Sequence, residues 1–138
     1  NDRSFSRSIL RLIHGNVFLG DLEKAYITTK NKKYFSCIEE ILFDYFNYLE
    51  KVPTNDKTVY HDETIALRLS YWLRIYLSCG KLFSQEIQIR FSALIFDHAE
   101  LLYSEKIYAG VNNHGFFQDL ALVNFHYIFQ EYKNSKKI

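Results

Sequence analysis

Methionine is absent from this chain of 138 residues, proline occurs once, and glycine occurs five times. So few chain-breaking residues exclude an architecture of short strands and tight turns and favour helices. Because no methionine stands even at position 1, we expect a piece of a larger protein. The first residues lack the apolar stretch of a signal peptide, and no run approaches the ~18 apolar residues of a membrane-spanning helix, so the compartment stays open.

Cysteine and excess charge are also scarce. Cys37 and Cys79 stand alone in apolar stretches, without metal-ligand spacing or the density of a disulfide scaffold, so both are predicted to be buried free thiols. The formal net charge is +1, and acidic and basic residues are interspersed. This pattern predicts neither a nucleic-acid partner nor a charged membrane-binding surface.

Large apolar side chains are abundant, with 48% apolar residues, 11 tyrosines and 12 phenylalanines. This composition excludes a disordered segment, and the length suits one domain, 1–138, with a core of its own. Apolar residues recur at intervals of three and four, which predicts amphipathic helices. The predicted helices cover residues 5–13, 21–29, 34–52, 62–79, 84–102 and 116–132.

The loops between these helices are short and no segment alternates like a strand, so neighbouring helices should be antiparallel. The predicted fold class is therefore all-α, built from antiparallel helical hairpins. The helix over 62–79 should be an inner one with Trp72 buried, and His98 should be a hydrogen-bonded core or rim residue. The packing face of the last helix is expected to comprise Phe117, Leu120, Ala121, Asn124, Ile128 and Tyr132.

The polar loop 110–119 is the most distinctive stretch, because Asn112, Asn113 and His114 stand in it directly before an apolar helix expected near Phe116. The first N–H groups of a helix lack partners and carry partial positive charge, so they can bind an anion. Asn113 and His114 would add side-chain donors toward a carboxylate or sulfate. The alternative is architectural, with asparagine as an N-cap and the flanking glycines as turn residues.

A second polar segment, 61–69, opens the inner helix with acidic residues. Asp62, Glu63 and Arg68 either line a substrate cleft, with Arg68 reaching an acidic sugar, or serve the fold. In the second case Asp62 caps the helix, Glu63 complements its dipole and Arg68 pairs with a carboxylate on a neighbouring helix. No histidine follows His61 at helical spacing, so no metal site is expected.

These two segments together carry a family resemblance. Asp-Glu-Thr-x-Ala-x-Arg-Leu at 62–69, followed by Asn-Asn-His-Gly-x-x-Gln-Asp-x-Ala-Leu at 112–122, resembles the heparinase II/III-like polysaccharide lyases. The likeness is closest to the branch found among bacterial surface-polysaccharide genes. It covers residues 60–129, about half the chain, while residues 1–55 resemble no family. It implies part of an incomplete α/α toroid, which a β-sandwich domain follows in the family.

The resemblance further implies β-elimination on acidic polysaccharides, without a cofactor. Fixed donors neutralise the uronate carboxylate while a side chain removes the neighbouring C5 proton. Asn113 would bind the carboxylate, with Asn112 beside it, and His114 would neutralise charge or transfer the proton. Gln118 and Asp119 would orient His114, or Asp119 would only complement the helix dipole.

The family's catalytic tyrosine and a further histidine have no counterparts here, so this piece alone is expected to be inactive. A truncated toroid should also expose apolar surface and self-associate. The competing hypothesis is a non-catalytic helical scaffold or protein-interaction module. A scaffold has no need of an exposed loop at 112–119 in a concave surface.

Overall fold

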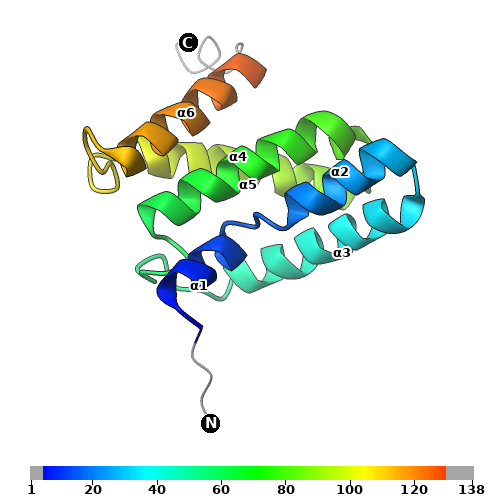
Figure 1. The fold of residues 1–138 in the computed structure, drawn as a ribbon, viewed down its shortest axis with the longest axis horizontal. Coiled ribbons are helices and arrows are strands. Elements are labelled where there is room, and N and C mark those ends of the chain that lie inside the picture. The colour runs from blue at the N-terminus through cyan, green and yellow to red at the C-terminus, as the bar shows by residue number, and fades with distance from the viewer. Residues whose placement is uncertain (1–4, 130–138) are drawn as a thin grey trace.

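The computed structural model describes residues 5–129, and that range is helical without any strand (Figure 1). The predicted all-α class is confirmed. The α-helices are α1 (Arg7–His14), α2 (Leu19–Thr29), α3 (Lys32–Leu49), α4 (Asp62–Cys79), α5 (Gln85–Tyr103) and α6 (Asn113–Ile128). A single 3₁₀ turn, η1 (Gly80–Leu82), extends α4. No helix within the described range is long and apolar enough to cross a membrane.

Helix α4 is the centre of the fold. It packs against α1, α2, α5 and α6, and nine of its 18 residues are buried. In Figure 1, α2, α4 and α6 run in one direction, and α3 and α5 run in the other. Successive helices from α2 to α6 are therefore antiparallel, and α4 is the inner helix that its nearly continuous apolar sequence predicts.

Trp72 of α4 occupies the middle of the core and is fully buried, as predicted. The rings of Phe46 and Phe91 meet it edge-on at centroid distances of 5.6 and 5.7 Å. Its indole N–H donates to Asn16 Oδ1 across 2.9 Å. Asn16 lies in the turn between α1 and α2 with a φ of 54°, a left-handed conformation that asparagine tolerates. One buried bond thus ties this turn to the central helix.

Arg68 is also fully buried, and the predicted pairing with a carboxylate on a neighbouring helix is wrong. Its guanidinium donates only to neutral acceptors, namely His98 Nε2 at 2.8 Å, the His14 carbonyl at 2.9 Å, Tyr45 Oη at 2.8 Å and the Val59 carbonyl at 3.0 Å. The His14 carbonyl is at the C-terminal, negative end of α1, which favours a cation there. Burial raises the pKa of Tyr45 to about 12, so its hydroxyl stays neutral and accepts this bond.

His98 is the core histidine that the sequence predicted, with only 2% of its surface exposed. Its Nε2 accepts from Arg68, so the ring proton is on Nδ1 and is donated to the Leu94 carbonyl at 2.7 Å. Burial, and secondly the charge of Arg68, hold the pKa of His98 well below its usual value. The imidazole is therefore neutral and links α4 to α5.

The expected packing face of α6 is right in part. Ala121 is buried and Ile128 packs against the core as predicted, whereas Phe117, Leu120 and Asn124 are exposed. The buried residues of α6 are Gly115, Gln118, Ala121 and Phe125. Helix α6 is apolar on nearly every side, so periodicity could not single out the face that packs. Tyr132 lies outside the described residues.

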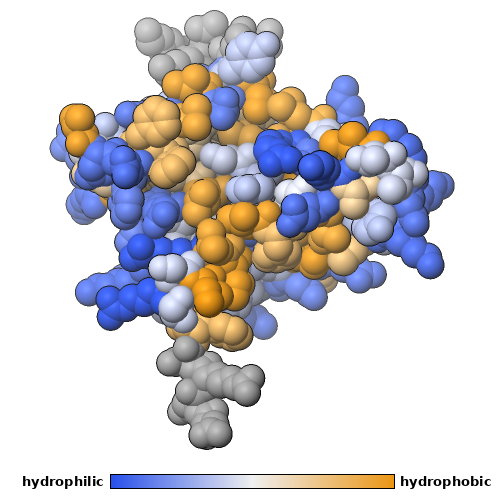
Figure 2. All heavy atoms as spheres, viewed as in Figure 1, coloured by the Kyte–Doolittle hydropathy of each residue, from blue (hydrophilic) through white to orange (hydrophobic). Residues whose placement is uncertain are grey.

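The outer face of α6 is an apolar stripe that the rest of the described chain leaves uncovered. It comprises Phe116, Leu120, Val123 and Tyr127, each at least 45% exposed. Apolar residues gather over α6 and again over α1 in Figure 2. The α1 group comprises Phe5, Ile9, Leu12 and Ile13. Of the two cysteines, Cys79 is buried as predicted, but Cys37 is only half-buried.

Candidate functional site

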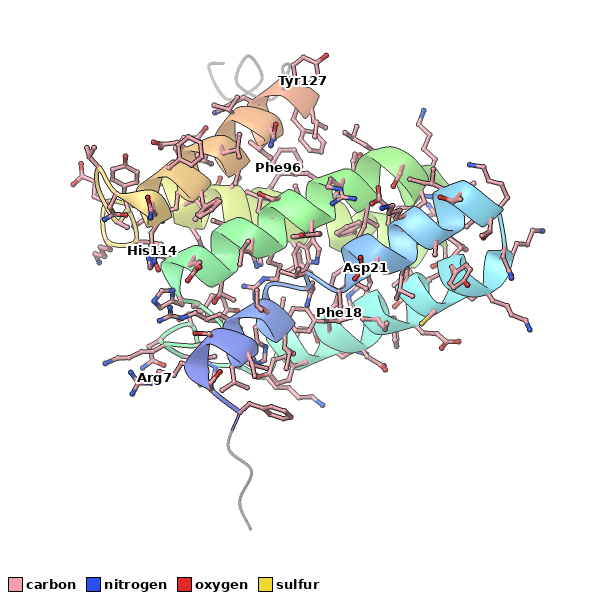
Figure 3. All side chains as sticks on the ribbon, in the orientation of Figure 1. Arg7, Phe18, Asp21, Phe96, His114 and Tyr127 are labelled. Carbon is pink, nitrogen blue, oxygen red and sulfur yellow. The ribbon has the colours of Figure 1, made fainter. Side chains whose placement is uncertain are left out.

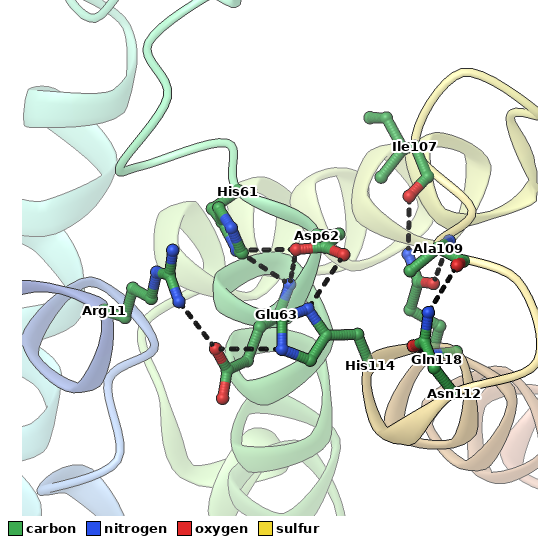
Figure 4. Close-up of polar contacts among 10 residues, drawn as sticks. Arg11, His61, Asp62, Glu63, Ile107, Ala109, Asn112, His114 and Gln118 are labelled. Atoms are coloured by element: carbon green, nitrogen blue, oxygen red, sulfur yellow. Dashed lines mark hydrogen bonds and ion pairs between the residues drawn. The ribbon is translucent and has the colours of Figure 1, made fainter. Parts of the chain in front are cut away.

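The two polar segments that the sequence singled out meet in space at the first turns of α4 and α6. His114 Nδ1 lies 3.2 Å from Asp62 Oδ2, although the two residues are 52 positions apart (Figure 4). Figure 3 shows His114 at the start of α6, beside the start of α4. The close packing of α4 on α6 holds these two helix starts together. The site therefore rests on the best-packed part of the fold.

Helix α6 begins at Asn113, three residues earlier than predicted, because Asn112 is its N-cap. Asn112 Oδ1 accepts from the Gly115 amide at 3.0 Å, and its Nδ2 donates to the Ala109 carbonyl at 2.6 Å. Both ends of this side chain are occupied, so Asn112 serves the fold. The architectural hypothesis thus holds for Asn112 and not for Asn113, whose exposed side chain makes no hydrogen bond to any described residue.

Two glycines let the preceding loop fold back onto the start of α6. Gly110 has a φ of +83°, and its carbonyl oxygen lies so close to Gly115 that a Cβ there would be 1.8 Å away. No side chain at position 115 fits that contact. Gly115 is therefore required by the close approach of the loop, which goes beyond the turn role that the sequence suggested.

Gln118 and Asp119 act on this loop rather than on His114, so their expected orienting role is wrong. Gln118 is fully buried, accepts from the Ala109 amide at 2.9 Å and donates to the Ile107 carbonyl at 3.0 Å (Figure 4). Asp119 is exposed and accepts from the Tyr108 hydroxyl at 3.3 Å. Together these bonds fix the loop that leads into α6.

At the start of α4, the carboxylate of Asp62 accepts two hydrogen bonds and also contacts the His61 ring. The Glu63 amide donates to Asp62 Oδ1 at 2.7 Å, His61 Nδ1 lies 2.6 Å from the same oxygen, and His114 meets Oδ2. The Glu63 amide also lies 3.3 Å from His61 Nδ1. The Glu63 amide is closer to Asp62 Oδ1 than to His61 Nδ1, so Asp62 is its main acceptor. His61 is the N-cap by position, but Asp62 caps the amide, as expected.

Glu63 extends the cluster to α1. Its Oε2 accepts from Arg11 Nη1 at 3.2 Å and lies 3.9 Å from His114 Nε2 (Figure 4). Sequence reasoning missed Arg11, and it considered His61 only as a metal ligand. No local pattern could have found Arg11, because its partner is 52 residues away.

The site is accessible from solvent. The side chains of Asp62, Arg11, Glu63 and His114 are 18%, 28%, 29% and 39% exposed. A hollow of about 380 Å³ opens beside them, lined by Asn112, Asn113 and His114. Arg68 lies in the core without exposed surface, so it does not line this hollow, and the expectation that it reaches a sugar is wrong. Within residues 5–129 no group of His, Cys, Asp and Glu has the arrangement of a metal site.

Of the two carboxylates beside the hollow, Glu63 is paired with Arg11, and the positive end of α6 is left open. Helix α4 carries Asp62 and Glu63 in its first turn, whereas α6 has no acidic residue there. The partial positive charge of the α6 N-terminus therefore remains available to an anion. Burial lowers the pKa of His61, and the charges of Arg11 and His114 lower it further against the opposing effect of Asp62.

No family model, curated protein or solved structure matches this chain. The case for a function therefore comes from the residues and geometry of the site itself. That geometry offers a helix N-terminus with a free amide side chain, next to an imidazole in contact with a carboxylate. Such a set is suited to holding an anionic group and exchanging a proton beside it.

Proposed function

We propose that this chain is the helical, toroid part of a polysaccharide lyase that cleaves uronic-acid glycans by β-elimination. One observation carries the proposal: both segments of the family resemblance, 62–69 and 112–122, meet at the contact between Asp62 and His114. Helices α4 and α6 run in the same direction, so their starts share one end of the fold, and the contact between Asp62 and His114 joins the two segments directly. The antiparallel all-α arrangement is also compatible with part of an α/α toroid.

In this proposal the uronate carboxylate binds at the start of α6. Asn113 Nδ2 and the open N–H groups of the first turn donate to it, which neutralises its charge and makes the C5 proton easier to remove. When that proton leaves, its electron pair forms the C4–C5 double bond and the C4–oxygen bond breaks. The departing glycosidic oxygen then takes up a proton. His114 lies next to Asn113 and accepts the C5 proton, and its protonated ring or water supplies the proton to the leaving oxygen.

Two carboxylates stand close to this subsite and would repel an acidic sugar if they were uncompensated. Asp62 accepts hydrogen bonds from His114 and the Glu63 amide, which spread its charge, and Glu63 is paired with Arg11. The substrate therefore meets one unpaired carboxylate charge, spread over these donors, at α4 and an electropositive helix end at α6. Glu63 and Asp62 support the site, and Arg68 supports the fold behind it.

A helical scaffold or interaction module is the second candidate, and the exposed apolar stripe on α6 is the observation that favours it. If a partner protein only packed against the α6 stripe, the open N–H groups and the exposed side chains at the start of α6 would bind nothing. The exposure of Asn113 and His114 beside an open hollow favours the lyase hypothesis over this one.

Binding of uronate oligosaccharides to this chain tests the proposal without requiring turnover. We expect titration with glucuronate- or mannuronate-containing oligosaccharides to shift the NMR signals of Asn113 and His114 first. Asn113→Ala should abolish the shift, while Asn55→Ala, an exposed asparagine in the loop before α4, should leave it intact. Equal binding by both variants would reject the subsite.

A longer parent chain with the remaining toroid and sandwich should form unsaturated uronate products, which absorb in the ultraviolet. If the parent binds the oligosaccharide at this site but releases no such product, the protein binds acidic glycans without being a lyase.

A further inference from the structure

Among the described residues, the side chain of Asp62 contacts both histidines of the site. Its Oδ1 accepts from the Glu63 amide and lies 2.6 Å from His61 Nδ1, and its Oδ2 lies 3.2 Å from His114 Nδ1 (Figure 4). An ionised carboxylate only accepts hydrogen bonds, so His114 must be the donor in its bond to Asp62. The ring proton of a neutral His114 is therefore on Nδ1.

This tautomer leaves a lone pair on His114 Nε2, the atom able to accept a proton from a ligand. Nε2 has no hydrogen bond within the described residues, because the nearest charged oxygen, Glu63 Oε2, is 3.9 Å away and is held by Arg11. The charged or titratable groups around the ring are Arg11 from α1 and His61, Asp62 and Glu63 from α4. Only Asp62 is hydrogen-bonded to it.

We propose that Asp62 is a positioning residue that fixes His114 in the Nδ1–H tautomer, so that Nε2 exchanges the proton with the substrate. The inference rests on the proposed function, in which His114 transfers a proton. It gives Asp62 a role in the chemistry through His114, in place of the direct substrate contact that the sequence suggested.

The substitution Asp62→Asn tests this role because the surrounding donors dictate how the new amide would sit. The Glu63 amide donates to the Oδ1 position at 2.7 Å, so the new amide oxygen must take that place. The amide NH₂ then faces His114 Nδ1 and donates to it. We expect His114 to switch to the Nε2–H tautomer, which long-range ¹H–¹⁵N NMR of the ring nitrogens distinguishes at a pH where the ring is neutral.

Glu63→Gln is the matched control, because it removes one negative charge beside the same ring without removing a hydrogen bond to it. It should leave His114 in the Nδ1–H tautomer. If the tautomer of His114 changes in both variants, the loss of negative charge alone causes the change and the proposal is overturned. If the tautomer does not change in a folded Asp62→Asn protein, the proposal is also overturned. If Asp62→Asn does not fold, Asp62→Ser removes the acceptor and keeps a capping hydroxyl, with the same expected switch. Wild-type His114 in the Nε2–H form would also overturn it.

Activity of the longer parent separates this inference from the proposed function. Asp62→Asn should lower kcat by on the order of a hundredfold or more with little change in KM, because proton transfer is lost and binding is kept. If the tautomer switches while the wild-type parent has no lyase activity, the proposed function fails and the placement of His114 by Asp62 stands. If the parent is active and Asp62→Asn keeps its kcat, the positioning role fails and the lyase proposal stands.

Discussion

Arg68 donates a hydrogen bond to His98 across 2.8 Å in the middle of the protein, and both side chains are buried. This pair joins the central helix α4 to α5 without any carboxylate. A buried guanidinium is tolerated here because four acceptors and the negative end of α1 surround it. The stability of the domain should therefore depend on both residues.

Arg68→Met should destabilise the domain by ~3–5 kcal/mol, close to the whole stability of a small domain. The methionine fills much of the space but leaves three acceptors, on His98, Tyr45 and Val59, without the arginine donor, each at a cost of about 1 kcal/mol, while the His14 carbonyl keeps the Tyr45 hydroxyl. Urea denaturation followed by Trp72 fluorescence measures the loss. Arg7→Met, at an exposed position of α1, is the matched control and should change stability by less than about 0.5 kcal/mol. Near-equal stability of the two variants would contradict the account of Arg68.

The lowered pKa of His98 predicts a loss of stability in mild acid. The pKa of His98 in the folded protein is well below the usual value of 6.5. Below pH 6.5, His98 therefore binds a proton in the unfolded chain but not in the native state. The contribution of His98 is complete above pH 6.5 and declines as the pH falls toward the folded pKa, by at most about 1.4 kcal/mol per pH unit. The melting temperature at pH 7.5 and pH 5.5 measures this decline.

His14 and His61 titrate in the same direction, since burial lowers both of their pKa values, so the wild-type curve alone does not isolate His98. His98→Gln keeps an acceptor for Arg68 and cannot be protonated. It should be less stable than wild type at pH 7.5 but should lose less on acidification. Identical slopes for the two proteins would assign the acid sensitivity to other groups.

The sequence predicted those features of the fold that depend on neighbouring residues. Helix α4 begins at Asp62 and ends at Cys79, as its acidic start and Gly80 indicated. Ser84 caps α5 as predicted and accepts from the Ile87 amide. The start of α6 was harder to predict. The helix begins three residues before the predicted position, because the preceding loop packs closely on Gly115.

Contacts between distant segments could not be read from the sequence. The four acceptors of Arg68 lie on α1, α3, the loop before α4, and α5, and no periodicity links them. The same holds for Arg11 and Glu63. In contrast, the residue types at the starts of α4 and α6 did indicate a shared site, although Asn112 and Gln118 proved to support the loop.

Self-association remains a prediction, and the stripe on α6 gives it a specific test. Phe116, Leu120, Val123 and Tyr127 follow one face of the helix and are all exposed. We expect sedimentation velocity to show association that rises with concentration and that Leu120→Lys suppresses. Leu77→Lys, at an exposed leucine of α4 outside the stripe, should leave it unchanged. A wild-type chain that stays monomeric at high concentration would contradict the prediction.

Substitutions of the two adjacent asparagines at the start of α6 should have different effects, one on stability and the other on activity. Asn112→Ala removes the N-cap and should cost ~1 kcal/mol of stability, because the Gly115 amide and the Ala109 carbonyl lose their partner. Asn113→Ala should leave the melting temperature nearly unchanged, since its side chain bonds to no described residue.

In the longer chain that the lyase proposal requires, Asn113→Ala should lower kcat about a hundredfold, because a lost donor to the developing charge is worth ~3 kcal/mol. Asn112→Ala should affect activity only at temperatures where it loosens the start of α6. Melting curves and ultraviolet assays of unsaturated uronate, run on both variants, measure the two effects side by side. Unaltered turnover in Asn113→Ala would remove the carboxylate-binding role, and with it the main chemical argument for a lyase.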